Sequence, residues 1–553
     1  MKTLFLSIIL ILTIMHTIGV SQQTRKAFIN GKVYTVNPSQ PLAEAVVTDG
    51  NRIIFAGTSH EAKKLLTPDA EVIDLKGRLM LPGFIDNHVH FMNGGFYLLG
   101  VNLRNARSTS EFKDILKKYV AKYEGRWITG GDWDHEAWEV NDLPQKEWID
   151  GFTPGTPVFV SRFDGHMGLA NSYALKLAGI TRYTQDPEGG LIVRDPATGE
   201  PTGILKDNAM SLVYSVMPQP NEKEYEEALL AALKEARIHG FTSVQDITYP
   251  NDLKMYQAFE REGRLSCRIY TRLPIADCEN LINSGLQYNF GSDKIKIGSL
   301  KAFADGSLGS STALFFEPYY QDSSTCGLAM DIVSDGRLKK WAMEADRARL
   351  QLCIHAIGDS ANSLMLDMFG EIVKANPAWD RRFRIEHAQH VIQSDVKRFA
   401  DYGVIASVQP YHLIDDGVWA GKRIGPARLK DAYPFKSFMN AGVKLCFGSD
   451  WSVAPLNAIM GIYAAVTRRT LDEKNPDGWI PEQKLSVEDA IKCYTINNAY
   501  ASFEEKIKGS IEAGKLADMV VLSDDILTID PVKIRDVRVE MTVFDGNVIY
   551  SAE

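Results

Sequence analysis

Short apolar runs alternate with amphipathic stretches through the middle of the chain. Apolar runs of strand length that are separated by helical periodicity are typical of a parallel sheet with crossover helices. Between two of the runs, residues 221–239 have helical spacing, with Asn221 as the expected cap and Gly240 as the stop. Eight strand-helix units close a (β/α)8 barrel, so the sequence predicts an α/β protein of this TIM-like class. The eight runs lie at 81–90, 241–247, 267–273, 297–303, 352–356, 383–389, 404–410 and 443–450.

The two ends of the chain carry a different pattern. Residues 27–36 and 44–57 are β-rich runs that contain Asn-Gly and Asp-Gly pairs, which are strong hairpin signals. Residues 517–525 and 539–552 repeat this style near the C-terminus. We therefore expect a composite β-sandwich built from residues 22–80 and 501–553, beside a barrel at 81–500.

A long segment separates the first two predicted barrel strands. Residues 91–220 are too many for a loop, so we expect an insertion that forms a lid or subdomain over one barrel mouth. It contains four tryptophans, which either line an apolar substrate pocket or pack within the insertion; we expect Trp133 at the substrate. The four are Trp127, Trp133, Trp138 and Trp148.

The first 21 residues have the features of a signal peptide. Lys2 precedes a mostly apolar run at 4–15, which is shorter than the ~20 residues of a membrane span. Gly19 and Ser21 suit a cleavage site, and an uncleaved anchor is the alternative. We expect an exported protein, periplasmic or secreted.

Cleavage after Ser21 is directly testable. N-terminal sequencing of the exported protein is expected to begin at Gln22, because small residues stand at the two positions that signal peptidases require. Exported protein that still begins at Met1 would contradict this prediction.

Composition narrows the class of partner. The 553 residues include 61 Lys and Arg against 70 Asp and Glu, a net charge of −9 with no basic block, which argues against nucleic acid as a partner. No later segment is apolar enough to predict stable membrane insertion after signal cleavage. None of the six cysteines forms a C-x-x-C pair, and Cys353 and Cys446 lie in apolar runs as expected core residues. Composition leaves open whether the chain is a homo-oligomer.

Polar residues stand at the ends of several predicted strands. His88 and His90 are two residues apart, so both face one side of a strand. His355, His387 and Asp450 close the fifth, sixth and eighth runs. A single strand histidine is more often a packing residue than a ligand. However, the C-terminal strand ends of a barrel share one face, where imidazoles and a carboxylate would form a site for a divalent metal such as zinc.

Lys301 lies inside the fourth run. A buried ammonium is costly, so this lysine is expected to lose its proton or to pair with a carboxylate such as Asp305. A neutral lysine can add carbon dioxide to form a carbamate, which is able to bridge two metals. His390 and His412 are further pocket candidates.

These motifs resemble the amidohydrolase superfamily, and within it the metal-dependent hydrolases similar to N-substituted formamide deformylase. The matching stretches, in order, are PGFIDNHVH, LKAFADGSLGSSTA, HAIGD, EHAQ, SVQP, GSDWSV and EAGKLADMVVL. The resemblance implies a one- or two-metal centre, with Lys301 as a carboxylated bridging ligand. Its other ligands would be His88, His90, His355, His387 and Asp450. The stretch RFDGHMGLANSYAL resembles the family's substrate-pocket motif and implies that His166 and Asn171 lie near the substrate.

The resemblance also implies a reaction. A metal-activated water would hydrolyse a non-peptide carbon–nitrogen bond in a small N-acyl, formamide or cyclic amide substrate, with Asp450 as general base and His387 or His355 stabilising the oxyanion. One alternative keeps the metal site but acts on an ester, a phosphoester or a deaminase-type C=N bond. The distant alternative is a non-catalytic binding protein on the same fold.

Overall fold

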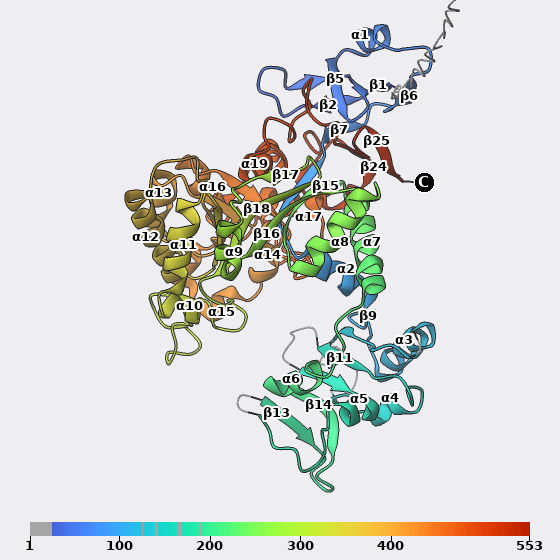
Figure 1. Ribbon diagram of the computed structural model, residues 1–553, viewed down its shortest axis with the longest axis vertical. Helices are drawn as coiled ribbons and strands as arrows, with labels where there is room; N and C mark the ends of the chain where they lie inside the picture. The colour runs from blue at the N-terminus through green and yellow to red at the C-terminus, as the bar shows by residue number, and fades with distance from the viewer. Residues whose placement is uncertain are drawn as a thin grey trace, which may run out of the picture.

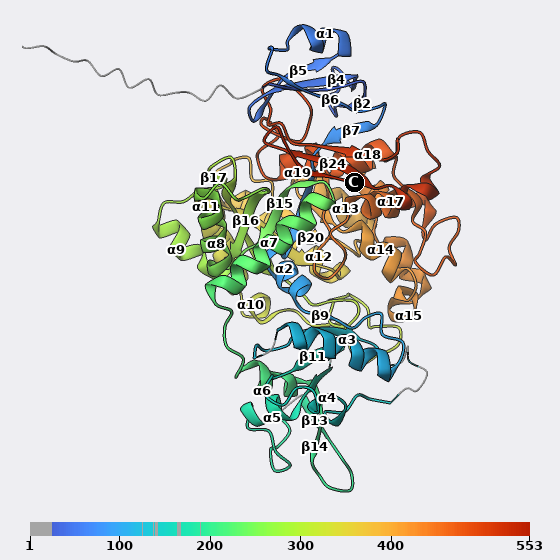
Figure 2. The same ribbon diagram turned by 90° about the vertical axis from the view of Figure 1, so that its right-hand side faces the viewer.

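The computed structural model describes residues 25–552 except 124, 136–137, 139–141, 163–166 and 188–189. The expected signal peptide therefore lies outside the described residues. Three parts follow one another along the long axis of the molecule: sheets formed by the chain ends, a barrel, and an insertion (Figures 1 and 2).

The barrel occupies the middle of the molecule. Its eight strands are all parallel to their neighbours, in the order β22-β21-β20-β19-β18-β16-β15-β8, and short β17 (Phe290–Gly291) pairs antiparallel with β18. A parallel bridge between Val89 and Trp451 brings the first and last strand ends together. The strands are β8 (Phe84–Val89), β15 (Phe241–Ile247), β16 (Arg268–Pro274), β18 (Ile295–Phe303), β19 (Gln351–Ala356), β20 (Arg384–His387), β21 (Ile405–Val408) and β22 (Leu445–Phe447).

These strands confirm the predicted (β/α)8 barrel. Each falls within or overlaps one of the eight predicted runs, because apolar β-rich segments were the signal and all eight strands are buried almost throughout. Helix α7 (Glu222–Ile238) also begins as predicted, since the Asn221 side chain accepts from Glu224 N and the Glu224 side chain caps Asn221 in return.

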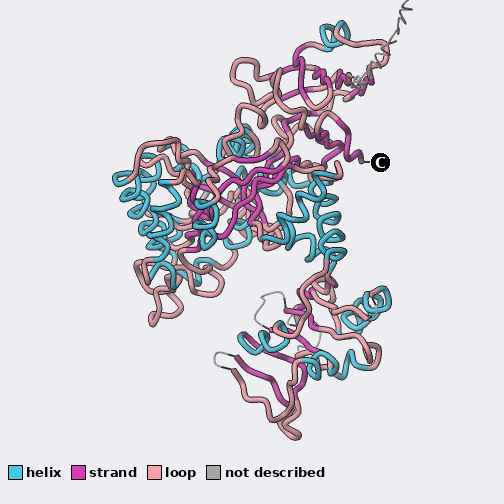
Figure 3. The backbone as a smooth tube through the Cα atoms, in the orientation of Figure 1, coloured by secondary structure: helices cyan, strands magenta, loops and turns pink. Residues whose placement is uncertain are grey.

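Helices surround the barrel strands, as the cyan coils of Figure 3 show. A continuous core of apolar side chains lies between helices and strands. The helices are α2 (Phe91–Leu99), α7, α8 (Pro250–Arg261), α9 (Cys278–Asn283), α10 (Asp331–Ser334), α11 (Arg337–Arg347), α12 (Asp359–Ala375), α13 (Gln393–Asp401), α14 (Pro410–Asp416), α15 (Ala420–Ile424), α16 (Phe435–Asn440), α17 (Ala458–Thr467), α18 (Val487–Cys493) and α19 (Ile496–Ala501).

Both chain ends contribute to the terminal sheets. The six-stranded sheet β25-β24-β23-β7-β2-β3 joins them, because β7 from the N-terminal part pairs antiparallel with β23 from the C-terminal part. Its strands are β2 (Lys32–Tyr34), β3 (Leu42–Ala43), β7 (Leu79–Pro82), β23 (Met519–Leu522), β24 (Val539–Phe544) and β25 (Asn547–Ser551). The second sheet has the order β5-β4-β1-β6, with β1 (Lys26–Ile29), β4 (Ala45–Asp49), β5 (Arg52–Gly57) and β6 (Glu71–Asp74), beside α1 (Ser59–Lys64).

The insertion is a subdomain with its own six-stranded sheet, in the order β13-β14-β12-β11-β10-β9. It begins later than residue 91, because α2 packs on the barrel against α7, where a Cβ at Gly95 would clash with the Ala228 carbonyl. Its elements are β9 (Val101–Asn102), α3 (Thr109–Lys122), β10 (Gly130–Trp133), α4 (Glu147–Asp150), β11 (Phe159–Arg162), β12 (Met167–Ala170), α5 (Ser172–Leu177), β13 (Gly190–Arg194), β14 (Pro201–Asp207) and α6 (Ser211–Tyr214).

Two sequence expectations concern the chain as a whole. Among the described residues, no helix has both the length and the apolar character needed to cross a membrane. All six cysteines are free, and Cys353 and Cys446 are buried in β19 and β22 as expected.

Candidate metal centre

The first part of the site is formed where β8 ends. His88 is a buried residue of β8, and His90 directly follows the strand at the start of α2. The Asp86 carboxylate accepts hydrogen bonds from the backbone nitrogens of His88 and Ser449, and Asp450 N donates to the His88 carbonyl at 2.7 Å. The backbone thus holds the His88 and Asp450 segments side by side.

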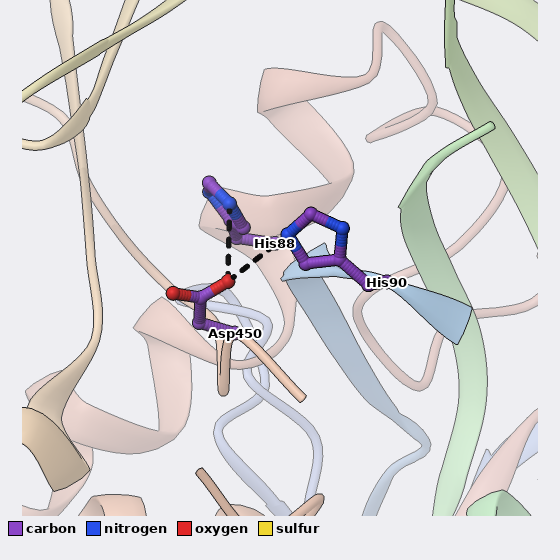
Figure 4. A group of neighbouring side chains, drawn as sticks. All are labelled: His88, His90 and Asp450. Atoms are coloured by element: carbon purple, nitrogen blue, oxygen red, sulfur yellow. Dashed lines mark ion pairs between the residues drawn. The ribbon is translucent and has the colours of Figure 1, made fainter. Parts of the chain in front are cut away.

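Asp450 faces both histidines of β8. Its Oδ1 lies 3.5 Å from His88 Nε2 and 3.4 Å from His90 Nε2. The dashed lines in Figure 4 mark these two contacts. One ligand atom from each residue lies within 4.8 Å of the others, a spacing that can hold a metal ion. Burial alone would raise the pKa of Asp450, but the imidazoles of His88, His90 and His387 hold that pKa well below its usual value, so the carboxylate is ionised.

A second triad shares Asp450. In this triad, one ligand atom from His387 at the end of β20, one from His412 on α14 and one from Asp450 lie within 4.8 Å of one another. His412 Nε2 lies 4.0 Å from Asp450 Oδ2. His387 and Asp450 both have left-handed backbone angles, with φ of 72° and 59°. Non-glycine residues rarely adopt these angles, and such strain is concentrated at functional sites. The backbone therefore turns at both strand ends in a way that brings these side chains together.

Polar partners orient the imidazoles. His88 Nδ1 bonds to the buried Glu386 carboxylate, which leaves Nε2 toward Asp450, and His387 Nδ1 lies 2.8 Å from Gln409 Oε1. A carboxylate or amide behind the ring is how metal-binding histidines are commonly fixed in one tautomer. Burial lowers the pKa of His88 and of His387 well below the usual value, so both rings are neutral and able to bind a metal.

His355 at the end of β19 belongs to the same cluster. Its ring centre lies 4.4 Å from that of His387, and its Nε2 lies 2.9 Å from the Gly306 carbonyl. With Nε2 as donor, Nδ1 keeps a lone pair, and this buried atom has no hydrogen-bond partner among the described residues. The structure therefore places an unused nitrogen ligand here.

Lys301 lies in β18 with 3% of its surface exposed. Burial lowers its pKa to about 8, and no described residue accepts a hydrogen bond from its Nζ. Asp305, the alternative partner, instead accepts from the backbone nitrogens of Leu314, Ile357 and Gly358. An orphaned, readily deprotonated amine close to a histidine cluster is the state from which a carbamate forms.

A network of buried charges lies beneath the histidines. The Glu386 carboxylate is 3.0 Å from Arg272 Nη1 and 2.9 Å from Arg384 Nε, and it accepts from Ser407 Oγ at 2.6 Å. Burial alone would raise the pKa of Glu386, but the two arginines and His88 hold it well below the usual range. Among the described residues, Glu386 is the carboxylate that pairs with both buried guanidinium groups, and it also orients the neutral His88 ring.

Glu386→Gln is expected to destabilise the fold by about 3–5 kcal/mol, because removing one partner of a buried ion pair leaves the other charge unpaired. Urea unfolding of the purified variant measures this change. The matched control is Glu505→Gln, which removes the partner of the more exposed Arg382 and is expected to cost below about 1 kcal/mol. Equal losses in the free energy of unfolding in the two variants would contradict the role of Glu386 as the partner of two buried guanidinium groups.

The histidine cluster opens into a cavity of about 550 Å³ at the C-terminal ends of the barrel strands. This is the face where barrel enzymes place their sites, and the volume suits a small molecule. Lys301 is buried and is not among the lining residues. The other five expected ligands all line the cavity: His88, His90, His355, His387 and Asp450.

The residues expected near the substrate are placed elsewhere. Asn171 is fully buried in the insertion, where its amide caps α5 and bonds to Thr153 and Thr156. Trp133 is also fully buried, and its Nε1 donates to the Val160 carbonyl. Neither lines the cavity, so the structure corrects both expectations: these side chains pack the insertion. His166 lies outside the described residues.

Two functional candidates were not assigned a role from the sequence. His412, noted only as a pocket candidate, completes the second triad. Glu386 carried one signal, a charged residue inside a buried strand, two residues after Arg384 of the same strand β20. The fold adds the partner Arg272 from β16.

The donor set fits a divalent metal. The rings of His88 and His387 are neutral and the Asp450 carboxylate is ionised, as a metal site needs. Buried nitrogens of Lys301, His355 and His412 have no hydrogen-bond partner among the described residues and are further donors. Since the two triads share Asp450, the arrangement can hold one ion or two.

Comparison with known proteins agrees with this geometry. The profile described as amidohydrolase family matches residues 71–550. Protein LONG AFTER FAR-RED 3 of Arabidopsis thaliana is 39% identical over 508 residues, covering 89% of this chain and 86% of that protein. N-substituted formamide deformylase of Arthrobacter pascens is 27% identical over 543 residues, covering 94% and 97%. A crystal structure of an uncharacterized metal-dependent hydrolase from Pyrococcus horikoshii matches with a TM-score of 0.78 at 30% identity, covering 92% of this chain and 99% of that chain.

Proposed function

Since this chain belongs to the amidohydrolase family, we propose that it hydrolyses a non-peptide carbon–nitrogen bond of an N-acyl compound, a formamide or a cyclic amide. The observation that carries the proposal is the sharing of Asp450 by two histidine triads at the cavity floor. N-substituted formamide deformylase, whose name states such a reaction, is similar along nearly its whole length.

The ligands that we propose are His88, His90, His355, His387, Asp450 and Lys301, with His412 as an addition. Imidazole and carboxylate donors together favour zinc among the common divalent ions. When bound, such an ion supplies a Lewis acid that polarises a carbonyl oxygen and acidifies water.

Asp450 is the proposed general base. It is ionised and buried, its two oxygens face different histidines, and it lines the cavity where a substrate carbonyl would sit. In this role the carboxylate accepts a proton from the attacking water and returns it to the leaving nitrogen, which must be protonated before it departs as an amine. The imidazoles and Glu386 hold Asp450 and each other in place during this transfer.

Lys301 is the proposed carbamate. Its neutral amine nitrogen bonds to the carbon of carbon dioxide and releases one proton to solvent, which converts an orphaned amine into an anion with two oxygen ligands. The lowered pKa and the absence of a described hydrogen-bond partner for Nζ support this step.

A matched substrate panel tests the reaction class. The zinc-loaded protein is offered an N-formyl amine, an N-acetyl amine and a cyclic imide, together with the corresponding formate ester, a phosphodiester and an amidine. We expect turnover of at least one amide, with a higher kcat/KM than for the ester, the phosphodiester or the amidine. A His88→Ala preparation purified in parallel controls for contaminating hydrolases. Faster turnover of the non-amide compounds would overturn the proposal.

A further inference from the structure

Helix α14 connects the metal centre to the cavity wall. It begins after β21, and His412 near its start faces Asp450 Oδ2 at 4.0 Å. Asp415 and Asp416 follow three and four residues later, so they share the helix face of His412, about one turn or 5.4 Å further along the axis. All three residues line the cavity. A pair of carboxyl groups therefore stands one helical turn from the proposed reaction centre.

This part of the cavity carries uncompensated negative charge. No lysine or arginine among the described residues lines the cavity, and none forms an ion pair with Asp415 or Asp416. The guanidinium of Arg423, which is not a lining residue, donates to the carbonyl of the cavity residue Gly309 and to Ser311 Oγ.

Asp416 is held in a fixed orientation. Tyr433 Oη and Gln389 Nε2 each donate to its Oδ2 at 2.6 Å, and no described residue donates to Oδ1. Gln389 is itself a cavity residue. The carboxyl group is thus oriented by neutral donors that fix its position without neutralising a charge.

The helix end disfavours acids at this position, although Asp416 satisfies the Tyr433 hydroxyl and the Gln389 amide. Asp415 and Asp416 end α14, where the exposed carbonyls form the negative end of the helix dipole and disfavour carboxylates. Adjacent like charges add to this cost, and no lysine or arginine of the described residues forms an ion pair with either acid. Two carboxyl groups at a helix end in the wall of a cavity, without a lysine or arginine of the described residues beside them, suit a ligand that carries a positive charge.

The same wall offers aromatic surface. Phe303 and Trp419 line the cavity, and the Trp419 ring lies against the rim at Gly309, where an added Cβ would be 3.8 Å from the ring. Aromatic faces attract cations, and carboxylates and rings together are the usual surroundings of bound ammonium groups.

We infer that the cavity selects substrates with a cationic nitrogen, a protonated amine or quaternary ammonium, about one helical turn from the hydrolysed carbonyl. Asp415 and Asp416 bind the cation, and Trp419 covers it. The substrate class is then the N-acyl derivative of a diamine or of another compound with a second basic nitrogen. The position of the hydrolysed bond rests on the proposed function, but recognition of the cation does not.

The effect of the ligand's positive charge on binding can be measured separately from hydrolysis. Choline and 3,3-dimethylbutan-1-ol have the same shape and differ by one positive charge, and neither contains an amide. Calorimetry with the zinc-loaded protein is expected to show choline binding about tenfold more tightly than the alcohol, as suits a charge-assisted contact. Asp415→Asn and Asp416→Asn are each expected to remove most of this preference. Asp69→Asn, a change of an exposed carboxylate outside the cavity, is the matched control and keeps it.

A comparison of kcat/KM for a cationic and a neutral amide tests whether cation binding also favours hydrolysis. N-acetyl-1,4-diaminobutane is compared with N-pentylacetamide, its neutral isostere, and kcat/KM is expected to favour the cationic amide about tenfold in the wild type. Asp415→Asn, at an exposed position that the fold does not depend on, is expected to lower only the value for the cationic amide. Equal binding of choline and the alcohol, or an unchanged preference in both variants, overturns the inference. A choline preference without hydrolysis of either amide upholds it and contradicts the proposed function.

Discussion

Asp450→Asn protein is expected to retain most of its metal and to lose roughly 10²- to 10⁴-fold in kcat, the span of positioned acid–base catalysis. The amide keeps the shape of the side chain and one oxygen ligand, but it cannot accept a proton at neutral pH. The substitution tests the proposed general base at the residue that the two triads share.

Removal of an imidazole is expected to act differently. His88→Ala and His90→Ala are expected to lose metal affinity first, and excess metal is expected to restore part of the rate. His239→Ala is the matched control, since His239 pairs with Glu235 on α7 outside the site. Metal content and kcat are measured on the same preparations. An Asp450→Asn enzyme that is both metal-replete and nearly as fast as wild type would move the base to a histidine such as His387 or His166.

Lys301→Ala is expected to lose both metal and activity. The lysine is buried and its Nζ has no hydrogen-bond partner among the described residues, whereas its carbamate would add an anionic ligand. Small carboxylic acids such as acetate are expected to restore part of both properties by occupying the space that the side chain leaves.

The control for this variant comes from the same strand. Lys296→Ala removes a partly exposed lysine of β18 and is expected to leave metal content and rate unchanged. Carbon-13 NMR of protein equilibrated with labelled bicarbonate is expected to show one carbamate carbon in the wild type and in Lys296→Ala, and none in Lys301→Ala. Full metal occupancy and turnover in Lys301→Ala would exclude the bridging role.

The barrel could be predicted because its signals are local. Each strand is an apolar run, and the two-residue spacing predicted His88 and His90 on one side of a strand. His90 in fact lies one residue beyond β8, but both rings face Asp450. Strand ends also share one barrel face by topology alone. The convergence of His355, His387 and Asp450 therefore followed from counting strands.

The remaining parts of the site depend on tertiary structure. His412 is in a helix after its strand, so its approach to Asp450 depends on how α14 leaves the barrel. The left-handed angles of His387 and Asp450 are not visible in the sequence, and Asp450 N is held by the His88 carbonyl from the first barrel strand. For Asn171 the sequence indicated too much. A motif resemblance placed it near the substrate, whereas its amide makes its hydrogen bonds within the insertion.

Chelation and reconstitution test metal-dependent carbon–nitrogen hydrolysis most directly. The protein is stripped with a chelator, titrated with zinc, and assayed for amine release from an N-formyl amine at each step, with bound metal measured on the same samples. We expect no amine release from the stripped protein and a rate that rises with occupancy to one or two ions per chain. Amine release that persists at full rate without bound metal would contradict the proposed reaction.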